Sequence, residues 1–130
     1  MYILDTNIII YFFKNMGSVA DRMLSKSPKD IAISIITLYE LEVGIEKSTN
    51  PEKRKKQLDK LVSRISVIPF AEKQSEFSAK IRAQLERKGE PIGPLDTLIA
   101  GTALSLNAVL TTHNIKEFER VDGLKIEDWF

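Results

Sequence analysis

The chain has 130 residues, of which 43% are hydrophobic and 28% are charged, and its formal net charge is +1. This composition is typical of one globular domain with a real core, and so weak a net charge excludes a strong overall attraction to nucleic acid. Any polyanion must therefore bind through local clusters of basic residues. Cysteine is absent, which excludes disulfides and thiolate metal sites and fits a reducing cytoplasm.

Targeting and membrane segments are also not expected. No apolar run is long enough to span a bilayer. Strand-like residues begin at position 2, so we expect no signal peptide.

Short apolar runs alternate with longer amphipathic stretches along residues 1–130. The pattern predicts strands at 2–4, 31–33, 67–68, 108–111 and 124–126. It predicts helices at 6–13, 19–24, 35–47, 52–65, 71–88, 94–106 and 115–118. We therefore expect a single α/β domain, with a short parallel sheet of four to five strands covered by helices on both faces.

The opening stretch centres on Asp5, which follows the first predicted strand and directly precedes a helix. A carboxylate at this place is a common way to mount a functional site in an α/β fold. Aspartate is also a preferred helix N-cap, and Thr6 or Asn7 could serve the same purpose. Taken alone, this stretch favours a capping role for Asp5 over a functional one.

Two acids compete on the helix predicted at 35–47, namely Glu40 and Glu42. Glu40 falls between the apolar residues Ile36 and Val43, where a buried carboxylate is costly without a partner. Thr37 and Glu40 also match a capping box, which explains the same residues by local structure. Periodicity does not choose between the two acids.

Further polar residues lie at the start of the helix predicted at 94–106 and directly after the fourth predicted strand. Asp96 lies in the first turn of the helix that Gly93-Pro94 opens, where the helix dipole favours an acid. Right-handed crossovers place the carboxyl ends of parallel strands at one edge of the sheet. The residues that we expect at this edge are Asp5, Glu40, Asp96, Thr112 and Asn114. Three acids and an amide at one edge are hard to attribute to capping alone.

Three carboxylates in one cleft repel one another unless a cation neutralises them. Hard oxygen ligands favour Mg²⁺ or Mn²⁺ over Zn²⁺ here, because there is no cysteine and only one histidine, His113. We expect His113 to be an exposed loop residue. The chain has no glycine-rich dinucleotide or P-loop motif.

Basic residues gather on the helix predicted at 52–65 and again near the end of the helix at 71–88. Such runs are usually solvated helix faces, but they can also bind a phosphate backbone. The candidate RNA-binding residues are Arg54, Lys55, Lys56, Arg64, Arg82, Arg87 and Lys88.

Four stretches together resemble the motifs of the PIN domain family. They are Leu4-Asp5-Thr6-Asn7, Ser34 to Leu41 with Gly44, Gly93 to Ala100, and Thr112-His113-Asn114 with Phe118. The resemblance is close to the VapC toxins of toxin–antitoxin pairs and covers essentially the whole chain. Residues 82–93 and 123–129 further resemble the VapC subgroup that cuts initiator transfer RNA.

The resemblance implies a PIN-like three-layer α/β/α fold and a Mg²⁺-dependent endoribonuclease, with Mn²⁺ as a possible substitute. It implies that Asp5, Glu40 and Asp96 hold the metal, which selects Glu40 over Glu42. Many PIN domains carry a fourth acid where Asn114 stands, so a second metal is in doubt. Supporting polar residues would be Thr6, Asn7, Thr112 and Asn114.

The expected reaction uses a metal-activated water and leaves a 5′-phosphate and a 3′-hydroxyl. The resemblance also implies a small VapB-like antitoxin as partner, an RNA substrate, a homodimer and no membrane association. Two alternatives remain at this point. One is a PIN-domain nuclease for RNA processing or quality control, and the other is a non-enzymatic α/β binding module whose acids are only caps.

Overall fold

A computed structural model describes all residues 1–130. Five parallel strands form one sheet in the order β3-β2-β1-β4-β5. The strands are β1 (Tyr2–Leu4), β2 (Ile31–Ser34), β3 (Ser66–Ile68), β4 (Val109–Thr111) and β5 (Lys125–Glu127). The predicted parallel sheet is therefore confirmed, with the last strand displaced by one residue.

Seven α-helices and one short 3-10 turn (Pro28–Asp30) connect the strands. The helices are α1 (Thr6–Phe13), α2 (Val19–Leu24), α3 (Ile35–Glu46), α4 (Pro51–Val62), α5 (Glu72–Arg87), α6 (Pro94–Ser105) and α7 (Ile115–Phe118). Helix α4 ends three residues earlier than the sequence predicts, because the hydroxyl of Ser63 donates to the Lys60 carbonyl and closes the last turn. None of the helices is both long and apolar enough to cross a membrane.

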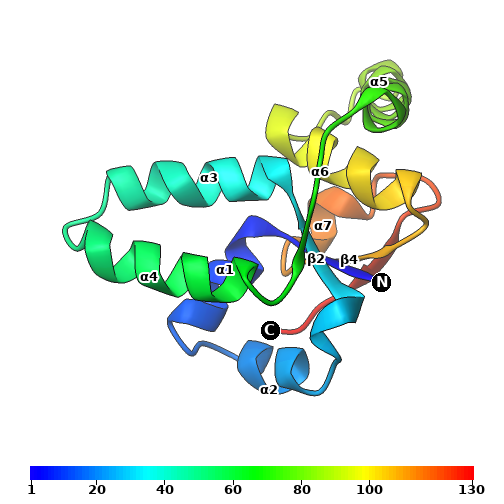
Figure 1. The fold of residues 1–130 in the computed structure, drawn as a ribbon. Coiled ribbons are helices and arrows are strands. Elements are labelled where there is room, and N and C mark those ends of the chain that lie inside the picture. Colours follow the sequence, from blue (N-terminus) through cyan, green and yellow to red (C-terminus); the bar gives the residue numbers. More distant parts are fainter.

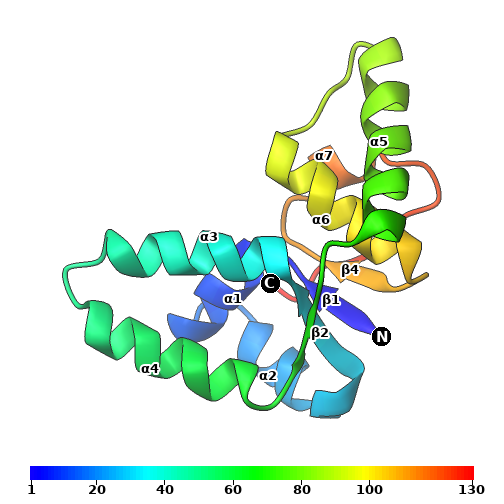
Figure 2. The ribbon, with the colours of Figure 1, turned by 45° about the horizontal axis from the view of Figure 1, so that its top comes forward.

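Helices cover both faces of the sheet, which confirms the three-layer architecture. Side chains alternate between faces along a strand, so Ile3 joins one core cluster and Leu4 the other. One cluster includes buried residues of α5, α6 and α7, and the other includes residues of α1, α2, α3 and α4. Figures 1 and 2 show α5 stacked on α6 at one end, while α3 and α4 run side by side away from the sheet.

The orientation of α6 is fixed by very close packing against α5. A Cβ added to Gly101 would lie 1.9 Å from the Ser78 hydroxyl oxygen, so only glycine fits at this crossing. Ile99, Ala100 and Ala103 are also fully buried on α6. Because this helix carries Asp96 in its first turn, the packing holds that carboxylate in place at the sheet edge.

Candidate active site

Asp5 lies at the carboxyl end of β1 and is only 5% exposed. It does cap α1, since its Oδ1 accepts the Thr6 backbone N–H at 2.8 Å. Its other oxygen, Oδ2, accepts the Thr112 hydroxyl at 2.8 Å. The cap and the functional explanations are thus compatible, because each carboxylate oxygen has a second lone pair free. Asp5 is held at both oxygens.

Thr6 links Glu40 to Asp5. The Thr6 hydroxyl donates to Glu40 Oε1 at 2.7 Å, and Thr6 directly follows Asp5. The capping box at Thr37 does not form, because Ser34 caps α3 three residues earlier by accepting the Ile36 N–H at 3.0 Å. Glu40 therefore lies inside the helix and half-buried at the site, whereas Glu42 is exposed.

Asp96 completes the predicted set of acids. Its pKa is raised to about 7, first by burial and then, in decreasing order, by the carboxylates of Asp5, Glu117 and Glu40 and by a hydrogen bond with Glu117. The pKa of Asp5 is raised chiefly by burial, against the lowering effect of its hydrogen bonds to Thr112 and Thr6. Repulsion from Glu40 and Glu117 also raises the pKa of Asp5. The acids thus influence one another directly.

Glu117 is the site residue that sequence reasoning missed. It lies on α7, and its Oε2 accepts the Asn114 side-chain amide at 3.0 Å. Asn114 stands where many PIN domains have an acid, and here it positions a carboxylate three residues further on. The spacing lets the two side chains meet on one turn of a helix, but it does not indicate that this turn faces the other acids. We call Asp5, Glu40, Asp96 and Glu117 the acidic edge.

The predicted supporting residues differ in their contacts. Thr112 donates to Asp5 and accepts the Asn114 backbone N–H at 3.0 Å, which links the acidic edge to α7. Thr6 and Asn114 also contact an acid, as described above. Asn7 is exposed, and its side chain contributes no hydrogen bond to this network. Three of the four predicted supporting residues therefore contact the acids.

The acidic edge has no basic counterpart within the chain. The five ion pairs of the molecule involve Glu127, Asp59, Glu86, Asp122 and Asp128, and none involves an acid of the edge. His113 is exposed as predicted, and its Nδ1 lies 2.9 Å from Asp128 Oδ2 while its ring stacks on Phe130. The acids carry a concentration of negative charge that an external cation would relieve.

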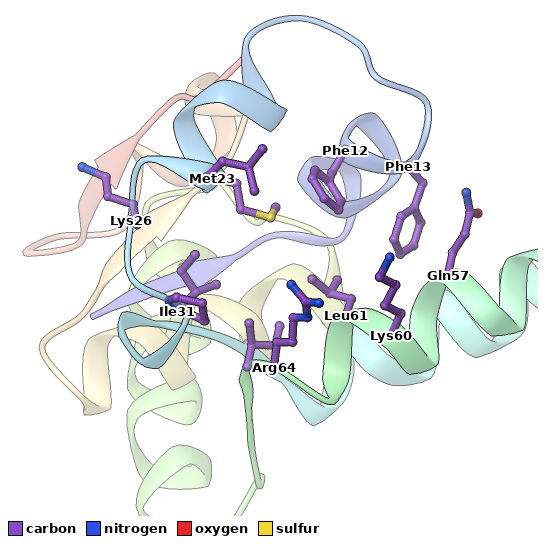
Figure 3. Close-up of a pocket in the computed structure, with 12 residues that line it drawn as sticks. Phe12, Phe13, Met23, Lys26, Ile31, Gln57, Lys60, Leu61 and Arg64 are labelled. Carbon is purple, nitrogen blue, oxygen red and sulfur yellow. The ribbon is translucent and has the colours of Figure 1, made fainter.

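Two hollows lie beside helix α4. One, of about 380 Å³ between α1, α2 and α4, has apolar walls that include Phe12, Met23 and Leu61, and a basic rim of Lys26, Lys60 and Arg64. In Figure 3 the ring of Phe13 lies beside the side chain of Lys60 from α4, with the ring of Phe12 next to it. No acid of the edge lines it. The second hollow, of about 270 Å³ between α1, α3 and α4, does include Glu40.

The predicted RNA-binding residues are distributed over three surfaces. Arg54 lines the hollow that contains Glu40, and Arg64 lines the hollow drawn in Figure 3. Lys55 and Lys56 are exposed, and Lys55 pairs with Asp59 on the same helix. On α5 and just beyond it, Arg82 pairs with Glu86 and Lys88 pairs with Asp122, whereas Arg87 is exposed without an ion pair. The chain thus has no single basic face.

Comparisons with known proteins identify the family. Residues 2–124 match the PIN domain. The chain is 41% identical over 128 residues to the tRNA(fMet)-specific endonuclease VapC of Shigella flexneri, covering 98% of this chain and 97% of the relative. A crystal structure of DNA-bound VapBC from Salmonella typhimurium superimposes with a TM-score of 0.93 at 40% identity, covering 99% and 98% of the two chains.

A second solved structure gives the same result. VapBC2 from Rickettsia felis, bound to a DNA fragment from its promoter, superimposes with a TM-score of 0.90 at 41% identity, covering 99% and 98% of the chains. These likenesses extend over nearly the full length, and they are to ribonucleases rather than to non-enzymatic binding modules. The chain therefore belongs to the PIN domain family and, within it, to the VapC ribonucleases of toxin–antitoxin systems.

Proposed function

We propose that this chain is an Mg²⁺-dependent endoribonuclease in which the acidic edge holds the ion, with Mn²⁺ as an effective substitute. One observation carries the proposal. Four carboxylates, one at the end of β1 and one each from α3, α6 and α7, lie together without a basic partner, and the pKa of Asp96 rises to about 7. PIN-domain nucleases generally use a divalent metal, and such a cation would remove this repulsion.

The donor set fits a hard cation. All the acids offer carboxylate oxygens, cysteine is absent, and His113 is paired with Asp128 instead. The acids do not yet enclose a common point. A hydrogen bond with Glu117 is among the contributions that raise the pKa of Asp96. A bound cation would relieve the repulsion among these carboxylates.

The chain's own residues would orient the ligands and the substrate. Thr6 and Thr112 fix Asp5, and the hydroxyl of Thr6 fixes Glu40. Asn114 holds Glu117. When bound, Mg²⁺ supplies an activated water and neutralises charge on the phosphate oxygens. No side chain of the site is needed as a general base, which agrees with the position of His113 outside it.

The substrate and partner come from the relatives. The Shigella flexneri relative is named as specific for tRNA(fMet), and the solved structures are complexes named VapBC. We therefore propose initiator transfer RNA as the substrate and a small VapB-like antitoxin as the inhibitor of this chain. An RNA substrate would place the activity in the cytoplasm.

Cleavage of initiator and elongator methionine transfer RNA tests the substrate. We expect cutting of the initiator form only, with a 5′-phosphate and a 3′-hydroxyl at the new ends. EDTA should abolish cutting and Mg²⁺ or Mn²⁺ should restore it. Equal cutting of both RNAs would contradict the proposed substrate and leave the chemistry intact.

A growth assay tests the partner. Expression of the chain alone should arrest growth, and co-expression of the neighbouring small open reading frame should relieve the arrest. Expression of Asp96→Asn should be harmless. Harmless expression of an enzyme that cuts RNA in vitro would argue for a processing nuclease instead.

A further inference from the structure

The hollow between α1, α3 and α4 continues directly from the acidic edge, because Glu40 belongs to both. Its walls are Ile10, Phe13 and Lys14 of α1 and its cap, Glu40, Leu41, Gly44 and Ile45 of α3, and Arg54 and Leu58 of α4, with Ser48 at the far turn. We call it the Glu40 groove. A polymer cut at the acidic edge could extend into this groove without leaving the protein surface.

Two cations line the Glu40 groove, and neither is neutralised by the chain. Lys14 is exposed and forms no ion pair, and Arg54 is half-buried and also forms none. The Arg54 Nη1 donates to the Gln57 side-chain oxygen at 3.2 Å, which holds the guanidinium near the groove wall. Glu40, whose carboxylate is held by Thr6, is the groove's one acid. These charges suit an anion that reaches toward the metal site.

The floor of the groove is apolar and open. Five hydrophobic side chains line it, including the aromatic ring of Phe13. A Cβ added to Gly44 would meet no atom within 4 Å, in contrast to Gly101, where packing requires glycine. A glycine inside a helix lowers helix stability relative to alanine, and no packing contact accounts for Gly44. Its missing side chain leaves room above the floor.

We propose that the Glu40 groove is a substrate subsite for one unpaired nucleotide next to the scissile phosphate. Lys14 and Arg54 bind its phosphate oxygens, and the floor with Phe13 receives the base. Bases stack on aromatic rings with little sequence preference, so the subsite contributes to affinity for any single-stranded segment. The inference rests on the proposed ribonuclease function and adds positioning residues to it.

Steady-state cleavage of fluorescein-labelled initiator transfer RNA, the proposed substrate, tests the charges. Arg54→Gln and Lys14→Gln should each raise KM roughly tenfold with a smaller change in kcat, as expected for the loss of one charge-assisted hydrogen bond. The matched control is Lys53→Gln, which makes the same charge change one residue away, on an exposed side chain outside the groove. Its KM should stay at the wild-type value.

A steric pair tests the open space. Gly44→Leu should fill the groove and raise KM by a similar factor, whereas Gly44→Ala should leave KM nearly unchanged and raise the melting temperature. Melting curves show whether each variant is folded. Asp96→Asn, which removes a proposed metal ligand, should be inactive in the same assay.

The outcomes separate the two proposals. If the wild type cuts RNA, Asp96→Asn does not, and Arg54→Gln and Gly44→Leu both keep a wild-type KM, the subsite is rejected and the ribonuclease stands. If those variants keep KM but no longer bind the antitoxin, the groove serves the antitoxin and the subsite is again rejected. An inactive wild type, or full activity in Asp96→Asn, rejects the proposed function and the subsite with it.

Discussion

The acidic edge and helix α4 are both charged regions, but the chain holds their charges very differently. The acids are half-buried or buried, and hydrogen bonds from Thr6, Thr112 and Asn114 fix three of them. The cations of α4 are mostly exposed, and the one ion pair of Lys55 is an i,i+4 pair at 3.8 Å on the helix surface.

This contrast indicates that the acidic edge contributes to cleavage, whereas the cations of α4 contribute to RNA affinity. A buried carboxylate that repels its neighbours stores an unfavourable interaction that binding of a cation relieves. An exposed lysine stores none, and its contribution to binding falls as salt rises. We therefore expect substitutions at the acidic edge to change the rate of cleavage by large factors. Substitutions on α4 should change the affinity for RNA by smaller factors that depend on the salt concentration.

The largest effect is expected for the acids themselves. Asp5→Asn and Asp96→Asn should each lower the cleavage rate at least ~100-fold, because loss of a ligand exceeds the 10–100-fold cost typical of residues behind the ligands. Mg²⁺ should raise the melting temperature of the wild type but not of Asp5→Asn. Glu42→Gln serves as the control, since Glu42 is exposed and should keep full activity. Equal melting shifts in wild type and Asp5→Asn would rule out Asp5 as a ligand.

The sequence predicts this region well because its geometry follows from strand order. Asp5 follows β1 and Thr112 follows β4, and these strands are neighbours in the sheet, so their carboxyl ends had to meet. Ser34 ends the other neighbouring strand and sets the start of α3, which places Glu40 inside that helix rather than in a cap. Thr37 also matched a capping pattern, but Ser34, three residues earlier and itself a predicted cap, is the residue that caps the helix.

Glu117 could not be recognised in the same way. It follows no strand directly, and α7 is a single turn of four residues whose direction depends on how Asn114 and Thr112 pack. The two hollows beside α4 could not be predicted from the sequence either, because they depend on how far α3 and α4 project from the sheet (Figure 2). Features built by packing between elements leave no periodic trace in the sequence.

Glu117→Gln tests whether the fourth acid belongs to the edge. We expect the cleavage rate to fall ~10- to 100-fold, because the amide keeps the size of the side chain but removes a charge beside Asp96. Asn114→Ala should give a smaller loss by releasing Glu117 from its hydrogen bond. Glu119→Gln, at the exposed acid that directly follows α7, is the matched control. Wild-type kinetics in Glu117→Gln would restrict the edge to three acids.

Stability against pH distinguishes the cost of a charged Asp96, which is buried beside other acids, from a stabilising role of its charge at the start of α6. The folded-state pKa is about 7, above the ordinary value of 3.8, so the native protein binds more protons than the unfolded chain between these values. The contribution of Asp96 to the free energy of unfolding therefore falls as pH rises through this window and is lowest above pH 7. The metal-free wild type should lose melting temperature over that range.

Asp96→Asn removes this penalty. Measured in EDTA, the variant should melt a few degrees above the wild type at pH 8 and close to it at pH 4. If Asp96 served only to complement the helix dipole, the variant would melt lower at pH 8, where the carboxylate is charged. A lower melting temperature at pH 8 would therefore support the helix-dipole role and count against a raised pKa of Asp96 in the acidic edge.

The smallest effect is expected on α4 outside the Glu40 groove. Lys55 and Lys56 are exposed and line neither hollow described beside this helix, so any role in binding is through long-range attraction to phosphates. Lys55→Glu with Lys56→Glu should weaken binding of RNA to the inactive Asp96→Asn protein a few-fold. The same pair should make the plot of log affinity against log salt less steep. The change should correspond to the loss of about one or two phosphate contacts. Metal binding should stay intact.

Lys29→Glu with Lys125→Glu changes the net charge equally on other exposed residues and controls for overall repulsion. If both pairs give the same slope as the parent protein, RNA does not run along the outer face of α4. The remaining basic surface is then that of Arg82, Arg87 and Lys88, where Arg82 lines a hollow shared with Pro94 and Thr97 beside Asp96.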